Sequence, residues 1–331
     1  MKKYVALFFI FIYISAVAQP TKKKLLCNPL VVGSIPKKQW SVQAELQSGF
    51  KNTATLYDLP IEKSNLLFAP VQGLRLNYYK PLILKQKTFL TLDVGYWVSY
   101  FDINNGAGLN RVTQAIAPST LHNISLATTI FKPIDAKHFI LINASVECNG
   151  NAVAMQNIDA DNFVAGGALI FGWKNGITKM MGIGVLRAYR LGKLIHVPAL
   201  LWNQNFNKKW GVEALLPARA TFRYAANKKT FITTGFDLEG TQYAFDTTAP
   251  SRFSLNNTFL QRGEIKTKIG LDTELSKRLR FTAQAGVRYM GRFNWSTDKA
   301  GNNLKIENKA NPNVYANVGL HIMPASKKKK K

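Results

Sequence analysis

Residues 279–293 read LRFTAQAGVRYMGRF, and the segment before them, residues 263–275, reads GEIKTKIGLDTEL. In both segments apolar and polar residues alternate with a period of two, which places the two kinds of side chain on opposite faces of a β-strand. Residues 90–100 and 313–322 show the same alternation. These segments run about 10 to 14 residues, roughly twice the length usual in soluble proteins, and this length is typical of strands that cross a membrane at a tilt.

The connections between such segments are of two kinds. The short ones are 81–86, 133–136, 174–176, 204–208, 227–228 and 276–278, and the long ones are 58–69, 102–120, 149–161, 241–262 and 294–312. A strict alternation of short and long connections is typical of outer-membrane barrels, which have short periplasmic turns and longer extracellular loops. We therefore predict an all-β fold, a transmembrane antiparallel up-and-down β-barrel, rather than a soluble sandwich whose apolar faces turn inward.

The pattern yields about 14 strands, an even number that puts both ends of the chain on the periplasmic side. The predicted strands are 40–50, 70–80, 88–101, 121–132, 138–148, 162–174, 177–190, 194–203, 209–216, 218–225, 229–240, 263–275, 279–293 and 313–323. Twelve strands are the alternative, because residues 180–224 carry the weakest pattern. Pro198 lies there inside a proposed strand, and Pro217 must form a tight external turn.

Aromatic residues recur beside the short connections. The predicted members of an aromatic girdle at the membrane interface are Phe131, Phe139, Trp173, Trp202, Trp210 and Phe231. Aromatic rings with a polar tip prefer the headgroup level of a bilayer, which favours this interpretation. The alternative is that aromatic residues simply favour strands.

The first residues predict export. Met1–Lys3 is basic, residues 4–15 are apolar, and Ala16-Val17-Ala18 fits a cleavage site, so residues 1–18 are interpreted as a signal peptide. The apolar run is shorter than the roughly 20 residues of a membrane-spanning helix, which argues against the alternative of an anchor helix. The remaining predicted divisions are a periplasmic segment 19–38, an outer-membrane β-barrel 39–324 and a lysine-rich tail 325–331.

The chain has 331 residues, with 44 Lys and Arg against 18 Asp and Glu, and a net charge of +26. An exported chain does not meet the nucleoid, so we expect no nucleic acid as partner. The cations cluster at the short connections, at Lys80, Lys85, Lys87, Lys132, Lys137, Lys174, Lys208, Lys209, Lys228, Lys229, Lys277 and Arg278. Such a basic periplasmic rim is suited to anionic lipid headgroups or other anionic envelope components. The alternative is that these lysines only maintain solubility and prevent unwanted strand pairing.

The polar faces of the later strands are predicted to line the barrel lumen. The candidates are Glu213, Arg219, Arg223, Asp237, Glu239, Lys266, Lys268, Asp272, Arg280, Arg288 and Arg292, together with Glu264 and Glu274. Acids and bases nearly balance in this set. It suits a water-filled wall that selects solutes, and it equally suits a network of ion pairs that closes a narrow lumen.

Nothing in the sequence predicts catalysis, a metal site or a cofactor. The four histidines are His122, His138, His196 and His321, and none lies in a nucleophile, zinc or phosphate-binding motif. Ser125 lies on the opposite strand face from His122 and is out of its reach. The two cysteines, Cys27 and Cys148, show no metal-ligand spacing.

Residues 197–202 (VPALLW), 210–217 (WGVEALLP), Tyr224 and the strand 231–240 resemble the central part of an uncharacterised bacterial outer-membrane β-barrel family. The resemblance implies an outer-membrane barrel and no known activity, so no functional residue is carried over. The end of the chain departs from the usual barrel signature, which finishes on an aromatic residue, because residues 322–326 read IMPAS.

Two functions remain in view. The first is a monomeric outer-membrane channel or transporter for small polar or amphipathic solutes, surrounded by outer-membrane lipid. The second is a closed structural or assembly barrel that is a partner of a cell-envelope complex, without transport or catalysis.

Overall fold

The structure is a computed structural model, and it describes residues 26–57, 61–103, 119–190, 193–246 and 255–324. The predicted signal peptide, the beginning of the predicted periplasmic segment and the predicted lysine-rich tail lie outside the described residues. The strands are β1 (Trp40–Gln47), β2 (Phe50–Leu56), β3 (Glu62–Phe68), β4 (Val71–Lys85), β5 (Thr88–Phe101), β6 (Ser119–Pro133), β7 (His138–Asn151), β8 (Phe163–Asn175), β9 (Lys179–Arg190), β10 (Lys193–Asn205), β11 (Trp210–Leu216), β12 (Arg219–Ala225), β13 (Thr230–Phe245), β14 (Thr258–Ser276), β15 (Leu279–Ser296), β16 (Leu304–Ala310) and β17 (Asn313–Ile322). Two short 3-10 helices, η2 (Ala154–Gln156) and η3 (Ala160–Asn162), lie between β7 and β8.

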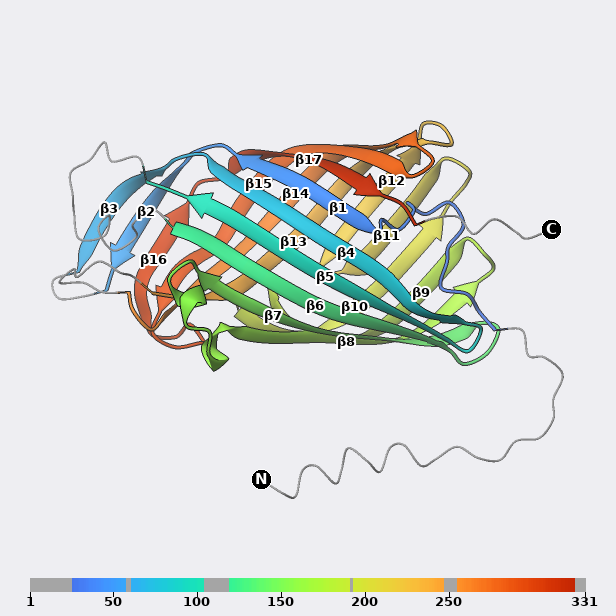
Figure 1. Cartoon of the computed structure of the whole chain (residues 1–331), viewed down its shortest axis with the longest axis horizontal. Coiled ribbons are helices and arrows are strands. Elements are labelled where there is room, and N and C mark those ends of the chain that lie inside the picture. Colours follow the sequence, from blue (N-terminus) through green and yellow to red (C-terminus); the bar gives the residue numbers. More distant parts are fainter. Residues whose placement is uncertain (1–25, 58–60, 104–118, 191–192, 247–254, 325–331) are drawn as a thin grey trace, which may run out of the picture.

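The strands form one closed antiparallel sheet (Figure 1). β1 pairs with β17 on one edge, with Trp40 opposite Ile322, and with β4 on the other, with Trp40 opposite Tyr78. From β4 each strand pairs with the next up to β15, and β15 pairs with β17. The ring therefore has 14 strands, and the predicted fold class is confirmed.

β2, β3 and β16 are continuations of ring strands. β2 follows β1, β3 precedes β4 and β16 precedes β17 in the chain. The β2–β3 pair continues the register of the β1–β4 pair, and the β16–β2 pair continues the register of the β1–β17 pair. The strands are interrupted between these paired parts at about the same level along the barrel axis, at residues 48–49, 69–70 and 311–312. Pro70 and Pro312 lie in two of these breaks, where they can donate no backbone hydrogen bond to a neighbouring strand.

The connections correct two predictions. Most of the predicted loop 58–69 is strand β3, and part of the predicted loop 294–312 is strand β16, because the strands reach further than the sequence pattern indicated. On the same end of the barrel the links 191–192 and 217–218 are only two residues long. The predicted strict alternation of short and long connections is therefore wrong at these two places. We call this end the long-loop end and the opposite one the short-turn end; the described chain begins and finishes at the latter (Figure 1).

The distribution of polarity is inverted relative to a soluble protein. Along β17 the apolar residues Val314, Val318 and Leu320 are 59%, 50% and 50% exposed, whereas Asn317 and His321 are 9% and 1% exposed. The other strands likewise have exposed Leu, Ile, Val and Phe side chains on their outer faces. An apolar outer surface with polar groups inside is the arrangement expected of a barrel surrounded by lipid.

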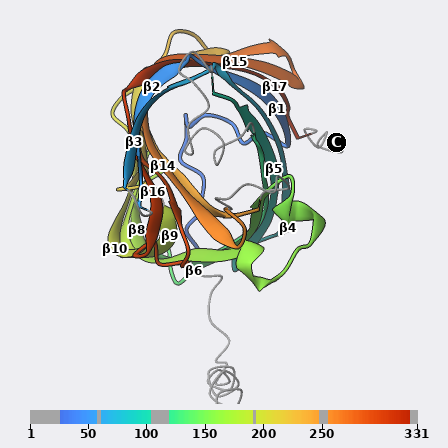
Figure 2. The same ribbon diagram turned by 90° about the vertical axis from the view of Figure 1, so that its left-hand side faces the viewer.

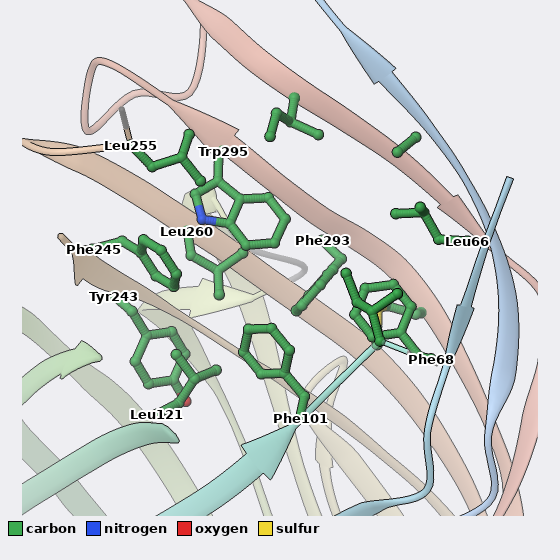
Figure 3. Packing of buried hydrophobic residues seen from close by; sticks show 14 of the residues in the cluster. Leu66, Phe68, Phe101, Leu121, Tyr243, Phe245, Leu255, Leu260, Phe293 and Trp295 are labelled. Carbon is green, nitrogen blue, oxygen red and sulfur yellow. The ribbon is translucent and has the colours of Figure 1, made fainter. Parts of the chain in front are cut away.

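The interior at the long-loop end is apolar. Seventeen buried residues form one cluster there, and Figure 3 shows ten of them by name, from Leu66 and Phe68 to Phe293 and Trp295. Phe293 packs edge-on against Trp295 and Phe68, with ring centroids 5.0 and 5.7 Å apart. This apolar cluster lies in the barrel interior at its long-loop end.

β13 bends into the barrel above the short hairpin of β11 and β12. These two strands have seven residues each, so beyond Asp237 the edge of β13 has no partner on β12. That part of β13 leans across to β7 instead, where Ala244 lies opposite Gly150 and Asn149 Nδ2 donates to Thr241 Oγ1 at 2.7 Å. Figure 2, which views the long-loop end, shows the orange strand crossing inside the ring. The opening at this end is narrowed accordingly.

The apolar cluster should contribute strongly to stability. We expect Trp295→Ala to lower the free energy of unfolding by about 3–5 kcal/mol, because Trp295 is fully buried and its removal leaves a cavity. Val185→Ala on the lipid-facing surface should have a much smaller effect. Urea denaturation in detergent micelles, followed by strand dichroism, measures both; equal effects would contradict an apolar core at this position.

Candidate functional site: the barrel interior

Lys266 lies at the centre of the interior charges. Its Nζ contacts three carboxylates, Glu45 Oε1 at 2.9 Å, Glu239 Oε2 at 3.1 Å and Glu264 Oε1 at 3.3 Å. Only 3% of the Lys266 side chain is exposed. The three partners come from β1, β13 and β14 itself, so this one ammonium group connects β14 with its neighbour β13 and with β1, from which β15 and β17 separate it in the ring.

Guanidinium groups surround the same carboxylates. Arg288 Nη1 lies 3.2 Å from Glu264 Oε2, Arg262 Nη2 lies 3.4 Å from Glu264 Oε1, and Arg75 Nη2 lies 3.2 Å from Glu239 Oε2. Buried carboxylates require such partners, because an unpaired buried charge is very costly. Together with Lys266 these groups form what we call the central ion-pair network.

A second group of ion pairs lies toward the short-turn end. Asp272 contacts Arg280 at 2.6 Å and Lys38 at 2.8 Å, and Lys268 contacts Asp237 at 2.6 Å. Arg280 also lies 3.9 Å from Glu274, and Arg223 lies 3.7 Å from Glu213. Most of the predicted lumen charges are thus paired with one another.

Ten of eleven predicted lumen-lining residues have their side chains on the inner face. They are Glu213, Arg219, Arg223, Asp237, Glu239, Lys266, Lys268, Asp272, Arg280 and Arg288. Arg292 is the exception, and its prediction is corrected: Gly291 is an extra residue in β15, since Met290 lies opposite Glu264 and Arg292 opposite Gly263. This β-bulge reverses the alternation, so Arg292 lies on the other face and donates to Gln261 at 2.9 Å.

Several interior charges were not predicted. Glu45, Arg75, Glu147 and Arg262 all take part in interior contacts. Glu45, Arg75 and Glu147 lie on the polar faces of alternating segments in the first half of the chain, and this alternation is the signal that points to them. Arg262 lies in the predicted loop 241–262, so the pattern assigned it to no strand face.

The aromatic girdle prediction is partly wrong. Trp210 is 51% exposed on the outer surface, and Trp173 and Trp202 are half-buried on the same outer side. Phe131, Phe139 and Phe231 are instead buried, at 4%, 0% and 8% exposure. Their places in the strand alternation point them inward, and Phe131 and Phe139 stack on each other with centroids 4.6 Å apart.

The N-terminal segment, residues 26–38, occupies the short-turn end of the interior (blue in Figure 2). Cys27 and Val31 pack against Phe131, Phe139 and Ile170. Lys174 Nζ donates to the carbonyl oxygens of Asn28, at 2.6 Å, and Leu30. Lys174 is therefore buried rather than a member of the exposed rim, contrary to its predicted place there.

Two further contacts hold the segment deeper in the barrel. The Ile35 amide donates to Glu213 Oε1 at 3.1 Å, and Lys38 pairs with Asp272. Burial acts to lower the pKa of Lys38, and the Asp272 carboxylate acts in the opposite direction. The segment is thus anchored to the barrel wall by charges and by apolar packing.

A cavity of about 600 Å³ lies inside the barrel. Its lining includes four carboxylates, Glu147, Asp237, Glu239 and Glu264, and four cationic side chains, Arg75, Arg219, Arg262 and Lys268. The formal charges of these eight groups cancel. Tyr243 of the apolar cluster and Ala218 of the β11–β12 link also line the cavity.

The interior histidine, His321, lies among hydroxyl groups. Its Nδ1 is 2.9 Å from Ser41 Oγ and its Nε2 is 2.7 Å from Thr282 Oγ1. In the part of the chain that the structure describes, no carboxylate forms a hydrogen bond with this ring, as activation of a serine would require. Within the described ranges, no group of three or more His, Cys, Asp or Glu side chains is arranged to hold a metal ion. In that same part of the chain no helix is long and apolar enough to cross a membrane.

The closed ring of strands, the apolar outer surface and the charged interior define an outer-membrane-type β-barrel. Residues 83–323 match the family described as a domain of unknown function, DUF6268, and the chain belongs to that family. The resemblance noted in the sequence is thereby confirmed. No curated protein matches the chain.

Solved outer-membrane proteins are similar in shape. A FadL homologue of Pseudomonas aeruginosa shares 8% identity over 86% of this chain and 90% of its own, with a TM-score of 0.44. An outer membrane channel from Pseudomonas putida F1 shares 7% identity over 92% and 100%, with a TM-score of 0.41. The Pseudomonas putida toluene transporter TodX shares 10% identity over 86% and 89%, with a TM-score of 0.37. These values describe distant similarity of shape.

The anchoring of the N-terminal segment can be tested at Cys27, which is 6% exposed. We expect Lys38→Gln combined with Lys174→Gln to speed maleimide labelling of Cys27 by about ten-fold or more, because each variant removes hydrogen bonds of a charged donor. Cys148→Ser serves as the background, and Lys132→Gln, an exposed lysine at the same end, as the matched control. An unchanged labelling rate would show that these contacts do not hold the segment.

Proposed function

We propose that this protein is a solute-specific channel of the bacterial outer membrane and that the 600 Å³ cavity is its solute-binding chamber. The cavity is the observation that carries the proposal. A barrel that served only as a scaffold could fill its interior completely with side chains, as small barrels do. Here space remains between charged walls at the middle of the barrel.

The outer surface and the rim support the proposed placement in the membrane. Apolar side chains cover the outer faces of the strands, and exposed lysines gather at the short-turn end. With the short turns in the periplasm, the long-loop end faces outward. We infer a monomer, since one chain closes the ring by itself.

The apolar cluster and residues 26–38 occupy opposite ends of the barrel interior. We propose that passage requires movement of at least one of them. This favours selective transport with small, infrequent openings over free diffusion through a wide pore.

Planar-bilayer recording tests the channel. We expect rare, small openings of the full chain and more frequent openings of the Lys38→Gln, Lys174→Gln double variant, whose N-terminal segment is loosened. Lys268→Gln should shift ion selectivity toward cations, because it leaves Asp237 without its partner at 2.6 Å. Lys132→Gln should behave as the wild type. Silence of the wild type and the double variant at every voltage would refute the channel.

A closed structural barrel is the second candidate. The central ion-pair network favours it, because Lys266 and Glu264 cross-link β1, β13, β14 and β15 through buried contacts. In that case the barrel would serve as a partner of an envelope complex. We propose no enzymatic activity in either case, since among the described residues the hydrogen-bond partners of the His321 ring are hydroxyl groups.

The exposed lysines of the short-turn end are proposed to bind anionic phospholipid headgroups of the surrounding leaflet. Members are Lys85, Lys87, Lys132, Lys137, Lys208, Lys209, Lys228, Lys229, Lys277 and Arg278, all exposed. Each cation near a charged membrane surface contributes about 1 kcal/mol of attraction, and salt screens the effect.

Lipid dependence of thermal stability tests this rim. In vesicles of phosphatidylcholine, added phosphatidylglycerol should raise the unfolding temperature at low salt and lose this effect at high salt. Lys208→Gln, Lys209→Gln and Lys228→Gln together should diminish the gain, whereas Lys51→Gln, Lys63→Gln and Lys309→Gln at the long-loop end should not. An equal response of both triple variants would refute a specific role of the short-turn end.

A further inference from the structure

Glu147 in the cavity wall is a carboxylate held by neutral groups. Its Oε2 accepts hydrogen bonds from Asn123 Nδ2 at 3.0 Å, Asn149 Nδ2 at 3.3 Å and Thr241 Oγ1 at 2.8 Å. Among the described residues no cationic side chain forms an ion pair with Glu147, and Oε1 accepts no hydrogen bond there. The donors from β6, β7 and β13 fix the carboxylate in place and leave one oxygen for a ligand.

Tyr243 lies beside this position with an unused hydroxyl group. The side chain is fully buried and lines the cavity, and its hydroxyl has no hydrogen-bond partner in the described part of the chain. Thr241, which binds Glu147, is two residues away on the same face of β13. A buried hydroxyl without a partner is unfavourable, and a bound ammonium group would donate to it.

Arg219 supplies a cationic group in the wall of the same cavity. It lines the cavity and lies opposite Asp237 on the neighbouring strand β13. The Asp237 carboxylate, however, forms its ion pair with Lys268. Among the described residues Arg219 forms no ion pair within 4.0 Å, although the Asp93 carboxylate and the Lys37 ammonium group are close enough to interact with it electrostatically. A guanidinium in this position can bind a carboxylate through two parallel hydrogen bonds.

The two groups are separated along the barrel. Glu147 binds Thr241 and Arg219 lies opposite Asp237, and these two β13 residues are four positions apart on one face. Four strand residues span about 13 Å at the backbone, and the long side chains of Glu147 and Arg219 reduce the gap between their charges. A ligand that meets both must carry its charges several bonds apart.

The net charge of the cavity agrees with a ligand that carries one charge of each sign. Four acids and four bases line it, so a solute with a single charge would leave one sign in excess. We propose, on the basis of the channel function above, that the cavity binds small linear zwitterions, with a terminal ammonium at Glu147 and Tyr243 and a terminal carboxylate at Arg219. ω-Amino acids and very short peptides belong to this class.

Three probes of equal length test the inference: 6-aminohexanoate, hexylamine and hexanoate. Titration calorimetry of the full chain in detergent should show 6-aminohexanoate binding about ten-fold or more tightly than either singly charged probe, which corresponds to about 1.4 kcal/mol. Equal binding of the three probes, or no binding of 6-aminohexanoate, would overturn the proposal.

Variants test the proposed contacts with the ammonium end and the carboxylate end of the ligand separately. Glu147→Gln should weaken 6-aminohexanoate and hexylamine and leave hexanoate unchanged, and Arg219→Gln should weaken 6-aminohexanoate and hexanoate and leave hexylamine unchanged. Tyr243→Phe removes only the hydroxyl and should act like a milder Glu147→Gln. Matched controls are Glu62→Gln and Arg187→Gln, which lie outside the cavity lining. Heat-modifiable migration on gels confirms folding of each variant, and loss of all probes together in a folded Glu147→Gln would contradict the assignment.

Uptake into proteoliposomes distinguishes this inference from the channel itself. Uptake of neutral and charged solutes without preference would keep the channel and reject the zwitterion site. Selective binding of 6-aminohexanoate without uptake would keep the site and reject transport. Faster uptake of 6-aminohexanoate than of hexylamine and hexanoate supports both.

Discussion

A strand surrounded by hydrocarbon has no water to satisfy its backbone, and every other feature of this molecule depends on the closure that this imposes. β1 meets the requirement by pairing with β17 on one edge and β4 on the other. Closure joins the first and last strands of the ring, fixes the width of the barrel and so determines which side chains meet inside. The central ion-pair network exists because closure brings Glu45 of β1 to Lys266 of β14, 221 residues away in the chain.

Alternation and strand length sufficed to predict the fold from the sequence. The 14-strand ring and the positions of nearly all strands follow from the period of two, because lipid outside and polar groups inside impose it on each crossing. The difficult region around Pro198 and Pro217 also conforms: Pro198 lies inside β10, opposite Val185, and Pro217 lies in the two-residue link between β11 and β12. The final strand ends at Ile322 without an aromatic residue and still pairs along its length with β1 and β15.

The site was less accessible to such reasoning, for three physical reasons. A bulge at Gly291 inverts the face of Arg292, and a single extra residue has no periodic signal. The N-terminal segment has no strand pattern, so its insertion beside Phe131 and Phe139 could not be seen, and these rings were assigned to the membrane interface instead. Pairing inside the lumen depends on which walls face one another across the barrel. In the described part of the chain, for example, Lys268 forms the ion pair with Asp237, although Arg219 lies opposite Asp237 on the neighbouring strand.

The aligned strand interruptions at 48–49, 69–70 and 311–312, together with the bulge at Gly291, restrict the sequence changes that the barrel can tolerate. Below them Glu45 and Gln47 face inward, and above them Phe50 and Leu56 do so, although the backbone pairing keeps its register. Four neighbouring chain segments exchange faces at one level, and the interior changes there from charged to apolar. A one-residue deletion in a single segment would turn that segment inside out against its unchanged neighbours. The boundary can therefore move along the barrel axis only if all four segments change together.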